Sequence, residues 1–461
     1  MGLDLTLLNN NKIKETLEKL TAKAKKYDVL AKQKSYALSV LSTLESLYPE
    51  GSWPVTGMRD IIYSNIIFGL NIPVENGAIV ITDQNDLVSN ILEALGKLIE
   101  MHLEFLKIRK VQQNILKASL EKPRICMYEG CLNLTNQGCH IIAESLLLKM
   151  FAPDRQVWTT MPDFFSNNGR RLKFYKKGIA KQLTFHGYCY DHDTPLFREI
   201  EGTNLFNPHE YRHLILQTYR TFCYQLRLKE IVLDTYQNYL QEPTLQQNLT
   251  FQEGYEGKKA KMAGEVRALC MLNTYKVLLD NHVKDRTLKD FEFKVYTFPK
   301  IPFCSYFIHF IPTILDVTYD ADHLFNLYQH YTETQLIEET INHLKIKNPT
   351  QDIKNLLLKH TATCNLVSDR ANSYFIVGYH KSSITIRDFC IKLDKLDTNT
   401  LLKEISDLLL KYVESWMCSP AFYREHIQPN EAEILRIREY FGNNPSERDY
   451  GTISFNLFEN I

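Results

Sequence analysis

The sequence predicts an α+β fold, and three observations along the chain lead to that class. Apolar side chains recur every three to four positions in residues 11–47, 87–120, 208–241 and 257–284. A period of two replaces this pattern in residues 291–298, 305–311, 373–379 and 382–389. Between the helical blocks, Arg124 to Glu201 is rich in glycine, cysteine and histidine. We therefore expect a helical N-terminal region, a small irregular module, further helices and a C-terminal antiparallel sheet with helices.

These changes in texture predict four regions. They are a helical N-terminal region at 1–122, the cysteine-containing module at 123–204, a second helical region at 205–288 and an α+β domain at 289–461. A length of 461 residues agrees with several structural units, because single hydrophobic cores stop growing well below that size.

Local signals place the helix ends. Asp86 is a plausible N-cap for a long helix over 87–120, and Pro208 is suited to the start of the helix over 208–241. A further helical segment is expected at 322–361, and a final helix at 398–417 is stopped by Cys418 to Pro420.

The strand signals predict one antiparallel sheet. Segments 373–379 and 382–389 are separated only by His380 and Lys381, which indicates a tight hairpin. The helical material at 322–361 would then be inserted between strands of this sheet.

Composition and charge limit the classes of partner and compartment. The formal net charge is zero and the pI is near 7.2, so a nucleic acid or a membrane surface would have to be recognised by a local patch. The N-terminal segment lacks the pattern of a secretory signal, and no run of about eighteen apolar residues occurs. We expect a cytoplasmic protein without a membrane partner. Ten cysteines in 461 residues are too dilute for a disulfide scaffold, so clustered ones are interpreted as metal ligands or catalytic thiols.

Two ligand pairs predict a zinc site. Cys126 and Cys131 form a C-x4-C pair, and much later in the chain Cys189 and His192 form a C-x2-H pair. Together they supply the four soft or borderline ligands of a closed tetrahedral site. A pair on a tight turn, a hairpin, and a second pair at the start of a helix is the layout of a treble-clef module. We expect Asp193 and Thr194 to cap that helix and Pro195 to lie in its first turn.

The order of these motifs resembles a known family of nucleases. A cysteine pair, then "CHII" at residues 139–142, then "GYCYDHD" at residues 187–193, is similar to the zinc-stabilised HNH, or ββα-metal, endonucleases. The resemblance implies that His140 is the general base that activates water. It also implies that Asp193 helps to hold a catalytic divalent ion, Mg²⁺ or Mn²⁺.

The chain departs from the family pattern at two points. The asparagine that the family places shortly before the second ligand pair is missing, since Thr184, Phe185 and His186 occupy that region. Asp193 replaces the usual histidine. The resemblance is confined to the cysteine-containing module and does not extend to the flanking regions. Segments "FHGYCYDHDTPLFREIE", "YR" at residues 219–220 and "SP" at residues 419–420 also resemble bacterial proteins, some in antiphage defence.

A basic run between the ligand pairs is the candidate surface for nucleic acid. Six positive charges fall within twelve residues without one acidic residue, interleaved with Phe174 and Tyr175; they are Arg170, Arg171, Lys173, Lys176, Lys177 and Lys181. A loop of this composition can neutralise phosphates and stack an unpaired base. We expect DNA rather than RNA as the partner. The alternative is an ordinary solvated basic face.

Other residues carry weaker predictions. Cys139 beside His140 would suit a Cys-His hydrolase only if both pointed the same way, which adjacent residues on a strand do not. Cys139 is otherwise a packing thiol or a spare zinc ligand. Glu199 and Glu201 are expected to be exposed, and His209 with His213 could share a metal. The remaining cysteines are interpreted as core thiols; they are Cys223, Cys270, Cys304, Cys364, Cys390 and Cys418.

The sequence thus supports two hypotheses of function. The first is a zinc-stabilised HNH-like nuclease that cleaves phosphodiester bonds, with His140 and Asp193 at the reacting centre. The second is a binding or assembly protein whose zinc module is structural only and whose N-terminal helices engage a protein partner. The missing asparagine would then reflect lost catalysis.

Overall fold

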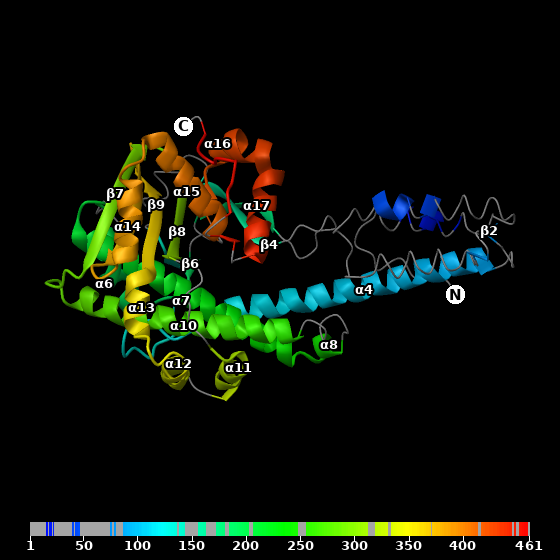
Figure 1. The fold of residues 1–461 in the computed structure, drawn as a ribbon, viewed down its shortest axis with the longest axis horizontal. Helices are drawn as coiled ribbons and strands as arrows, with labels where there is room; N and C mark the ends of the chain where they lie inside the picture. The colour runs from blue at the N-terminus through cyan, green and yellow to red at the C-terminus, as the bar shows by residue number, and fades with distance from the viewer. Residues whose placement is uncertain are drawn as a thin grey trace. The chain divides into compact units, whose positions relative to one another are not determined.

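A computed structural model describes much of the chain after residue 85 and short pieces before it. The described residues are 15–16, 18–20, 22, 39–40, 42–46, 74–75, 78–79, 86–135, 138–142, 155–162, 172–179, 184–201, 206–247, 255–311, 319–330, 333–369, 371–413, 416–444, 447–448 and 451–459. The chain forms two compact units (Figure 1).

The first unit consists of Met1–Leu116, Asp163–Arg171 and Glu242–Glu253. It contains an antiparallel strand pair, most of one long helix and one short helix: β1 (Val74–Glu75), β2 (Ala78–Ile79), α4 (Asp86–Glu121) and α8 (Pro243–Gln246). The helix predicted over 87–120 is confirmed. Of the helices predicted over 11–47, the described residues from 15 to 46 are helical, and the others lie outside the described residues.

The second unit is built on a seven-stranded antiparallel sheet. Its strand order is β5-β4-β11-β8-β9-β10-β7. The bounds are β4 (Gln156–Pro162), β5 (Leu172–Gly178), β7 (Phe291–Pro299), β8 (Phe303–Phe310), β9 (Thr361–Ser368), β10 (Asn372–His380) and β11 (Trp416–Cys418). The C-terminal antiparallel sheet predicted from the period of two is therefore present.

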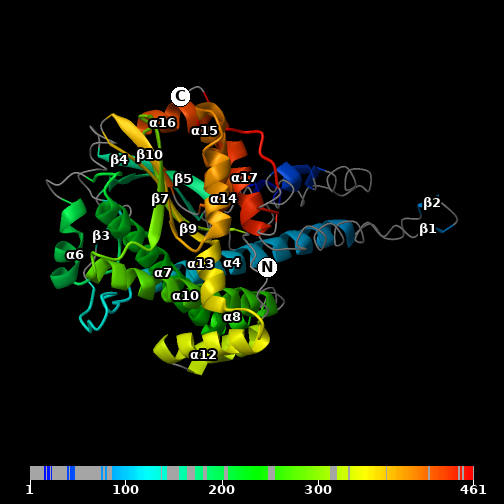
Figure 2. The same cartoon turned by 60° about the vertical axis from the view of Figure 1, so that its left-hand side comes forward.

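Helices cover both faces of this sheet. The helices of the second unit are, from Tyr190 onward, α6 (Tyr190–Phe197), η3 (Arg198–Ile200), α7 (Tyr211–Gln241), α10 (Tyr255–Lys284), α11 (Ala321–His330), α12 (Glu333–Lys347), α13 (Ile353–His360), α14 (Ile384–Leu393), α15 (Thr398–Tyr412), α16 (Pro420–Phe422), η4 (Tyr423–Ile427), η5 (Gln428–Asn430) and α17 (Glu431–Asn443). Figures 1 and 2 show α14, α15 and α17 on one side of the sheet and α7 with α10 on the other.

Alternation along the strands explains the two faces. On β9, Cys364 and Leu366 belong to the core that contains α14, α15 and α17. The residues between them face α7, where Thr221 Oγ1 donates to the Asn365 side chain at 2.9 Å. Successive strand residues point to opposite faces, so β9 is buried on both sides. At this point the second unit has α14, α15 and α17 on one side of the sheet and α7 on the other, with α10 packed against α7.

The predicted strand over 382–389 is wrong, because α14 begins at Ile384. The Ser383 side chain accepts a hydrogen bond from the Ile386 backbone N–H at 3.3 Å, which caps the helix. Ile386, Cys390 and Leu393 then recur at helical spacing on the buried face. The run of β-branched residues imitates a strand, and β10 pairs with β7 and β9 instead of forming the predicted hairpin.

The structure differs from the prediction in two further regions, a helix that ends early and a module that is divided between two structures. The helix expected over 398–417 ends at Tyr412, and residues 416–418 form the sheet strand β11. Residues 123–204, expected to form one module, contribute to two structures, because β4 and β5 join the large sheet through β11. No helix among the described residues has both the length and the apolar character needed to cross a membrane.

Candidate metal centre

The first ligand pair lies on a small hairpin turn between Arg124 and Thr135. Ile125 and Leu134 form a β-bridge, and the Cys126 N–H donates to the Asn133 carbonyl at 2.9 Å. The turn closes where the Cys131 N–H donates to the Tyr128 carbonyl at 3.0 Å. Gly130 has a φ of 79°, a backbone conformation that other residues adopt only at a cost. The turn therefore holds two thiols close together on adjacent arms.

The second ligand pair begins helix α6. Cys189 is the N-cap residue, and His192 follows one turn later with its N–H donating to the Cys189 carbonyl at 3.0 Å. The predicted caps, Asp193 and Thr194, are instead inside the helix. Asp191 and Asp193 fall in the first turn, where negative charge favours the helix dipole.

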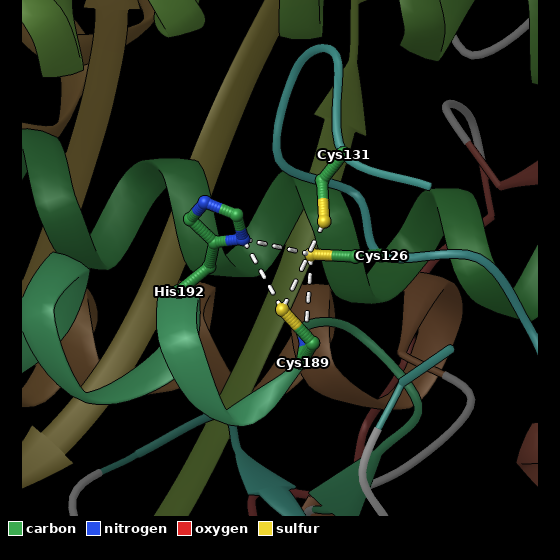
Figure 3. A group of neighbouring side chains, drawn as sticks. All are labelled: Cys126, Cys131, Cys189 and His192. Carbon is green, nitrogen blue, oxygen red and sulfur yellow. Dashed lines mark hydrogen bonds between the residues drawn. The ribbon is translucent and has the colours of Figure 1, made fainter. Parts of the chain in front are cut away.

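The four predicted ligands converge on one point (Figure 3). Their ligand atoms all lie within 4.8 Å of one another. The Cys131 and Cys189 sulfurs are 3.9 Å apart, and His192 Nδ1 lies 3.2 Å from Cys189 Sγ and 3.7 Å from Cys126 Sγ. A zinc tetrahedron with bonds of about 2.3 Å to sulfur and about 2.0 Å to nitrogen requires separations of about 3.5 to about 3.8 Å. The residues fit a bound metal ion such as zinc, and Nδ1 is the histidine atom that would coordinate it.

Contacts around the ligands hold this arrangement. The Cys189 N–H points at Cys126 Sγ at 3.3 Å, and the Met127 N–H donates to the Gly187 carbonyl at 2.8 Å. The Tyr128 ring stacks on His192 with centroids 4.1 Å apart and planes 8° from parallel. Burial raises the pKa of the Cys126 thiol to about 11. A metal ion would offset that cost, because it stabilises the thiolate.

Buried charges attach the hairpin turn to helix α7. Asp234 accepts from Arg124 at 2.7 Å, from Lys122 at 3.1 Å and from the Tyr328 hydroxyl at 3.3 Å. Arg227 donates to the Ile125 carbonyl at 2.7 Å. These residues line a cavity of about 780 Å³ between the turn and the helices. The turn is thereby fixed on α7 independently of the metal ligands.

A two-stranded sheet joins the ligand pairs and carries His140. Strand β3 (Cys139–His140) pairs antiparallel with β6 (Thr184–Phe185), and His140 lies opposite Thr184. The order of turn, hairpin strands and helix is therefore the one predicted for a treble clef, with β4 and β5 inserted between the two strands. No asparagine occurs in β6.

Asp193 lies half-buried on α6 and is electrostatically coupled to His140. Burial raises the pKa of the Asp193 carboxyl, while the Arg220 guanidinium acts to lower it. Asp193 Oδ1 is buried and accepts no hydrogen bond from the described protein atoms. The predicted base and the predicted ion-holding residue thus belong to one neighbourhood. Among the described residues, the only group of three or more metal-ligating side chains is the Cys126, Cys131, Cys189 and His192 set.

Cys139 is a packing thiol. It is buried, its sulfur contacts the Tyr188 carbonyl at 3.4 Å and the Tyr188 N–H at 3.3 Å, and it is outside the ligand group. Burial raises the pKa of this thiol to about 12. A thiolate nucleophile at Cys139 is therefore disfavoured at neutral pH.

Glu199 and Glu201 are ion-paired, contrary to the expectation that they are exposed. Glu199 accepts from Arg212 at 3.3 Å and from Arg286 at 2.7 Å. Glu201 accepts from Arg220 at 2.5 Å. The sequence analysis singles out Arg220 only through the resemblance of "YR" at residues 219–220, and it does not predict the ion pair with Glu201.

The basic run does not form a loop in its described part. Leu172–Gly178 is strand β5, at the edge of the large sheet, with Lys173 and Lys176 exposed and Lys177 half-buried. Phe174 points into the core and contacts Trp416 with ring centroids 5.5 Å apart. Arg170, Arg171 and Lys181 lie outside the described residues. Lysines on an edge strand also prevent that strand from pairing with another sheet. This role would explain the basic residues of β5 as an ordinary solvated face, without any contact to nucleic acid.

The remaining predicted residues are structural. His213 accepts from the Asn207 N–H at 2.9 Å and lies 3.2 Å from Glu210, so it fastens the start of α7 rather than sharing a metal with His209. The six other cysteines are buried, as expected for core thiols.

No family model, curated protein or solved structure matches this chain. The interpretation of the site therefore depends on its own geometry and chemistry.

The metal assignment predicts the effect of removing one ligand. C131S should lower the zinc content from about one equivalent to near zero, because three ligands do not close a structural site. C139S is the matched control, since Cys139 is buried in the same module without being a ligand, and it should keep its zinc. Elemental analysis of both purified variants measures this. Equal zinc in C131S and wild type would contradict the assignment.

The anchoring network predicts a stability cost that is separate from metal binding. D234N should lower the free energy of unfolding by about 2 kcal/mol, because buried Arg124 loses its 2.7 Å ion pair and keeps only the 4.0 Å pair with Glu230. Arg436–Glu433, an exposed pair on α17, provides the control, and E433Q should cause little change. Urea denaturation followed by circular dichroism measures both. A D234N midpoint equal to that of E433Q would show that Asp234 contributes nothing to anchoring.

Proposed function

We propose that the chain is a zinc-stabilised nuclease of the HNH type that cleaves phosphodiester bonds in DNA. The observation that carries the proposal is the placement of His140 on the hairpin strand β3 and of Asp193 on α6, within a module whose four metal ligands converge. Cleavage of invading DNA in the cytoplasm is the setting that the sequence resemblance suggests.

His140 would be the general base. Its imidazole is half-buried on a short strand, and a neutral imidazole can accept a proton from water near neutral pH. The strand is fixed from both ends, because Cys139 is held by Tyr188 and the Ile141 carbonyl accepts from Gln217 at 3.0 Å. A base held in this way keeps one orientation.

Asp193 would hold the divalent ion. Mg²⁺ or Mn²⁺, when bound, would neutralise charge on the scissile phosphate. A carboxylate oxygen is the type of ligand these ions prefer, and Asp193 Oδ1 is an acceptor without a protein donor among the described atoms. Magnesium sites commonly use only one or two carboxylates and complete the shell with substrate phosphate and water.

The exposed lysines of β5 would contact the DNA backbone. Lys173 and Lys176 are exposed, and Tyr175 lies between them with Lys177 Nζ 5.7 Å from its ring centroid. An exposed lysine on an edge strand can pair with a backbone phosphate. This contact supplies affinity without sequence preference.

A second candidate function is supported by an exposed apolar group at the hairpin turn. Ile125, Leu132 and Leu134 are 55%, 84% and 62% exposed. Contiguous apolar surface at one place is typical of a docking site for another protein. In this alternative the zinc module is structural only, and the chain is a binding or assembly component.

Replacing the base provides the test of the nuclease proposal. With Mg²⁺ or Mn²⁺, H140A should cleave plasmid DNA about 10²- to 10⁴-fold more slowly than wild type while keeping its zinc. H209A, which changes an exposed histidine just before α7, is the matched control and should cleave normally. No cleavage by wild-type protein that contains its zinc would sink the nuclease proposal and favour the docking alternative.

The lysines of β5 make a separate prediction about salt. In an H140A background without divalent ions, K173Q with K176Q should bind duplex DNA more weakly, and the slope of log affinity against log salt should fall by about one per lost phosphate contact. K392Q removes an exposed lysine of α14 and is the control. Fluorescence anisotropy at several salt concentrations measures the slopes. An unchanged slope in the double variant would assign these lysines to a solvated face.

A further inference from the structure

Arg220 of α7 is buried beneath the neighbourhood of His140 and Asp193. Its relative exposure is 0%, and its Nη2 donates to Glu201 Oε1 at 2.5 Å. The guanidinium carbon lies 3.8 Å from the centroid of the Phe197 ring, which Arg220 therefore covers face-on as a cation–π contact. One edge of the guanidinium is thus anchored by Glu201 and its plane by Phe197.

Two nitrogens of the Arg220 guanidinium have unused donors. Nε and Nη1 are buried and donate to no described protein atom, and Asp193 Oδ1 is a buried acceptor in the same state. Leaving buried polar atoms unpaired is costly, and the cost is larger for charged groups. Unpaired buried donors lower the stability of the folded protein, and a functional role that needs the side chain in a fixed position is one explanation for them.

Helical geometry brings Arg220 close to Asp193. Asp193 and Phe197 are separated by four positions on α6, so they share one face of that helix. The guanidinium that covers Phe197 therefore lies about one turn from the Asp193 carboxylate, and its charge acts on both Asp193 and Cys139. Cys139 is the strand neighbour of His140. Arg220 accordingly faces the two elements that carry the proposed catalytic pair.

We propose that Arg220 is a positioning residue that fixes the Asp193 carboxylate beside His140, and that Glu201 in turn orients Arg220. This role rests on the proposed nuclease function, for which Asp193 holds the divalent ion. Because Arg220 is fully buried, it acts through Asp193 and does not contact the substrate. A planar guanidinium suits the task, since anchoring Nη2 and the plane of the group leaves its remaining donors in a fixed orientation.

The chain contains a matched control for this proposal. Arg212 also projects from α7 toward the end of α6, where it pairs with Glu199 at 3.3 Å. R212M therefore breaks an ion pair between α7 and η3, together with hydrogen bonds to the His282 and Val283 carbonyls. A merely structural role would make R220M and R212M similar in activity.

The experiment compares cleavage kinetics of R220M, R220K and R212M, each with its zinc content measured. R220M should lower kcat roughly 10- to 100-fold with KM and zinc unchanged, because displacement of a reacting group by about 1 Å has that effect. R220K should also lower kcat, and R212M should retain it. A kcat for R220M equal to that of R212M would overturn the proposal. If R220M fails to fold, the kcat of R220K with intact zinc is compared with that of R212M instead, and equal values would again overturn the proposal.

A second measurement separates this proposal from the nuclease proposal. Mn²⁺ binding is followed by electron paramagnetic resonance in wild type, D193N and R220K, which needs no activity. Lysine keeps the positive charge, so a change in affinity reports the position of Asp193. Binding lost in D193N and weakened roughly tenfold in R220K would support positioning even if wild type cleaves nothing. Wild-type affinity in R220K, or no Mn²⁺ binding by wild type, would overturn it.

Discussion

The meeting of four ligand atoms from two distant segments is the constraint on which the surrounding structure depends. Cys126 and Cys131 must reach Cys189 and His192, although the two pairs are far apart in the sequence. The intervening chain therefore leaves through β3 and returns through β6, and within that excursion β4 and β5 pair with each other and with β11. The segment that connects the two ligand pairs therefore also supplies two strands of the large sheet.

Helix α7 connects this centre to the rest of the second unit. Asp234, near its C-terminal end, holds the arginine that precedes the metal turn; Arg220, in its middle, pairs with Glu201 beyond α6; and Thr221 bonds to the sheet. Burying so many charges is favourable only where each has a partner, because an unpaired buried charge costs several kcal/mol. The unused donors of Arg220 are an exception to this pairing. These donors lie near the residues proposed to act on the phosphate, where the fixed charge of Arg220 would hold the Asp193 carboxylate in place.

Features set by local spacing can be predicted from the sequence, and features set by distant partners cannot. The ligand pairs are recognisable because soft donors three and five positions apart define a metal site locally, and α7 and α10 are recognisable from their period. The place of β4 in the large sheet escapes prediction, because its partner β11 lies far along the chain. Residues 382–389 are misassigned because a serine cap outweighs a β-branched run, and the Arg220–Glu201 pair exists only once α7 packs on the end of α6.

We propose that a closed metal site with three sulfurs and one imidazole organises the module that carries His140 and Asp193. X-ray absorption at the zinc edge of the purified chain tests this most directly, because it reports ligand type and distance without relying on activity. We predict three sulfur ligands at about 2.3 Å and one nitrogen at about 2.0 Å from the metal. A shell dominated by oxygen or nitrogen, or a chain purified under reducing conditions without bound metal, would contradict this.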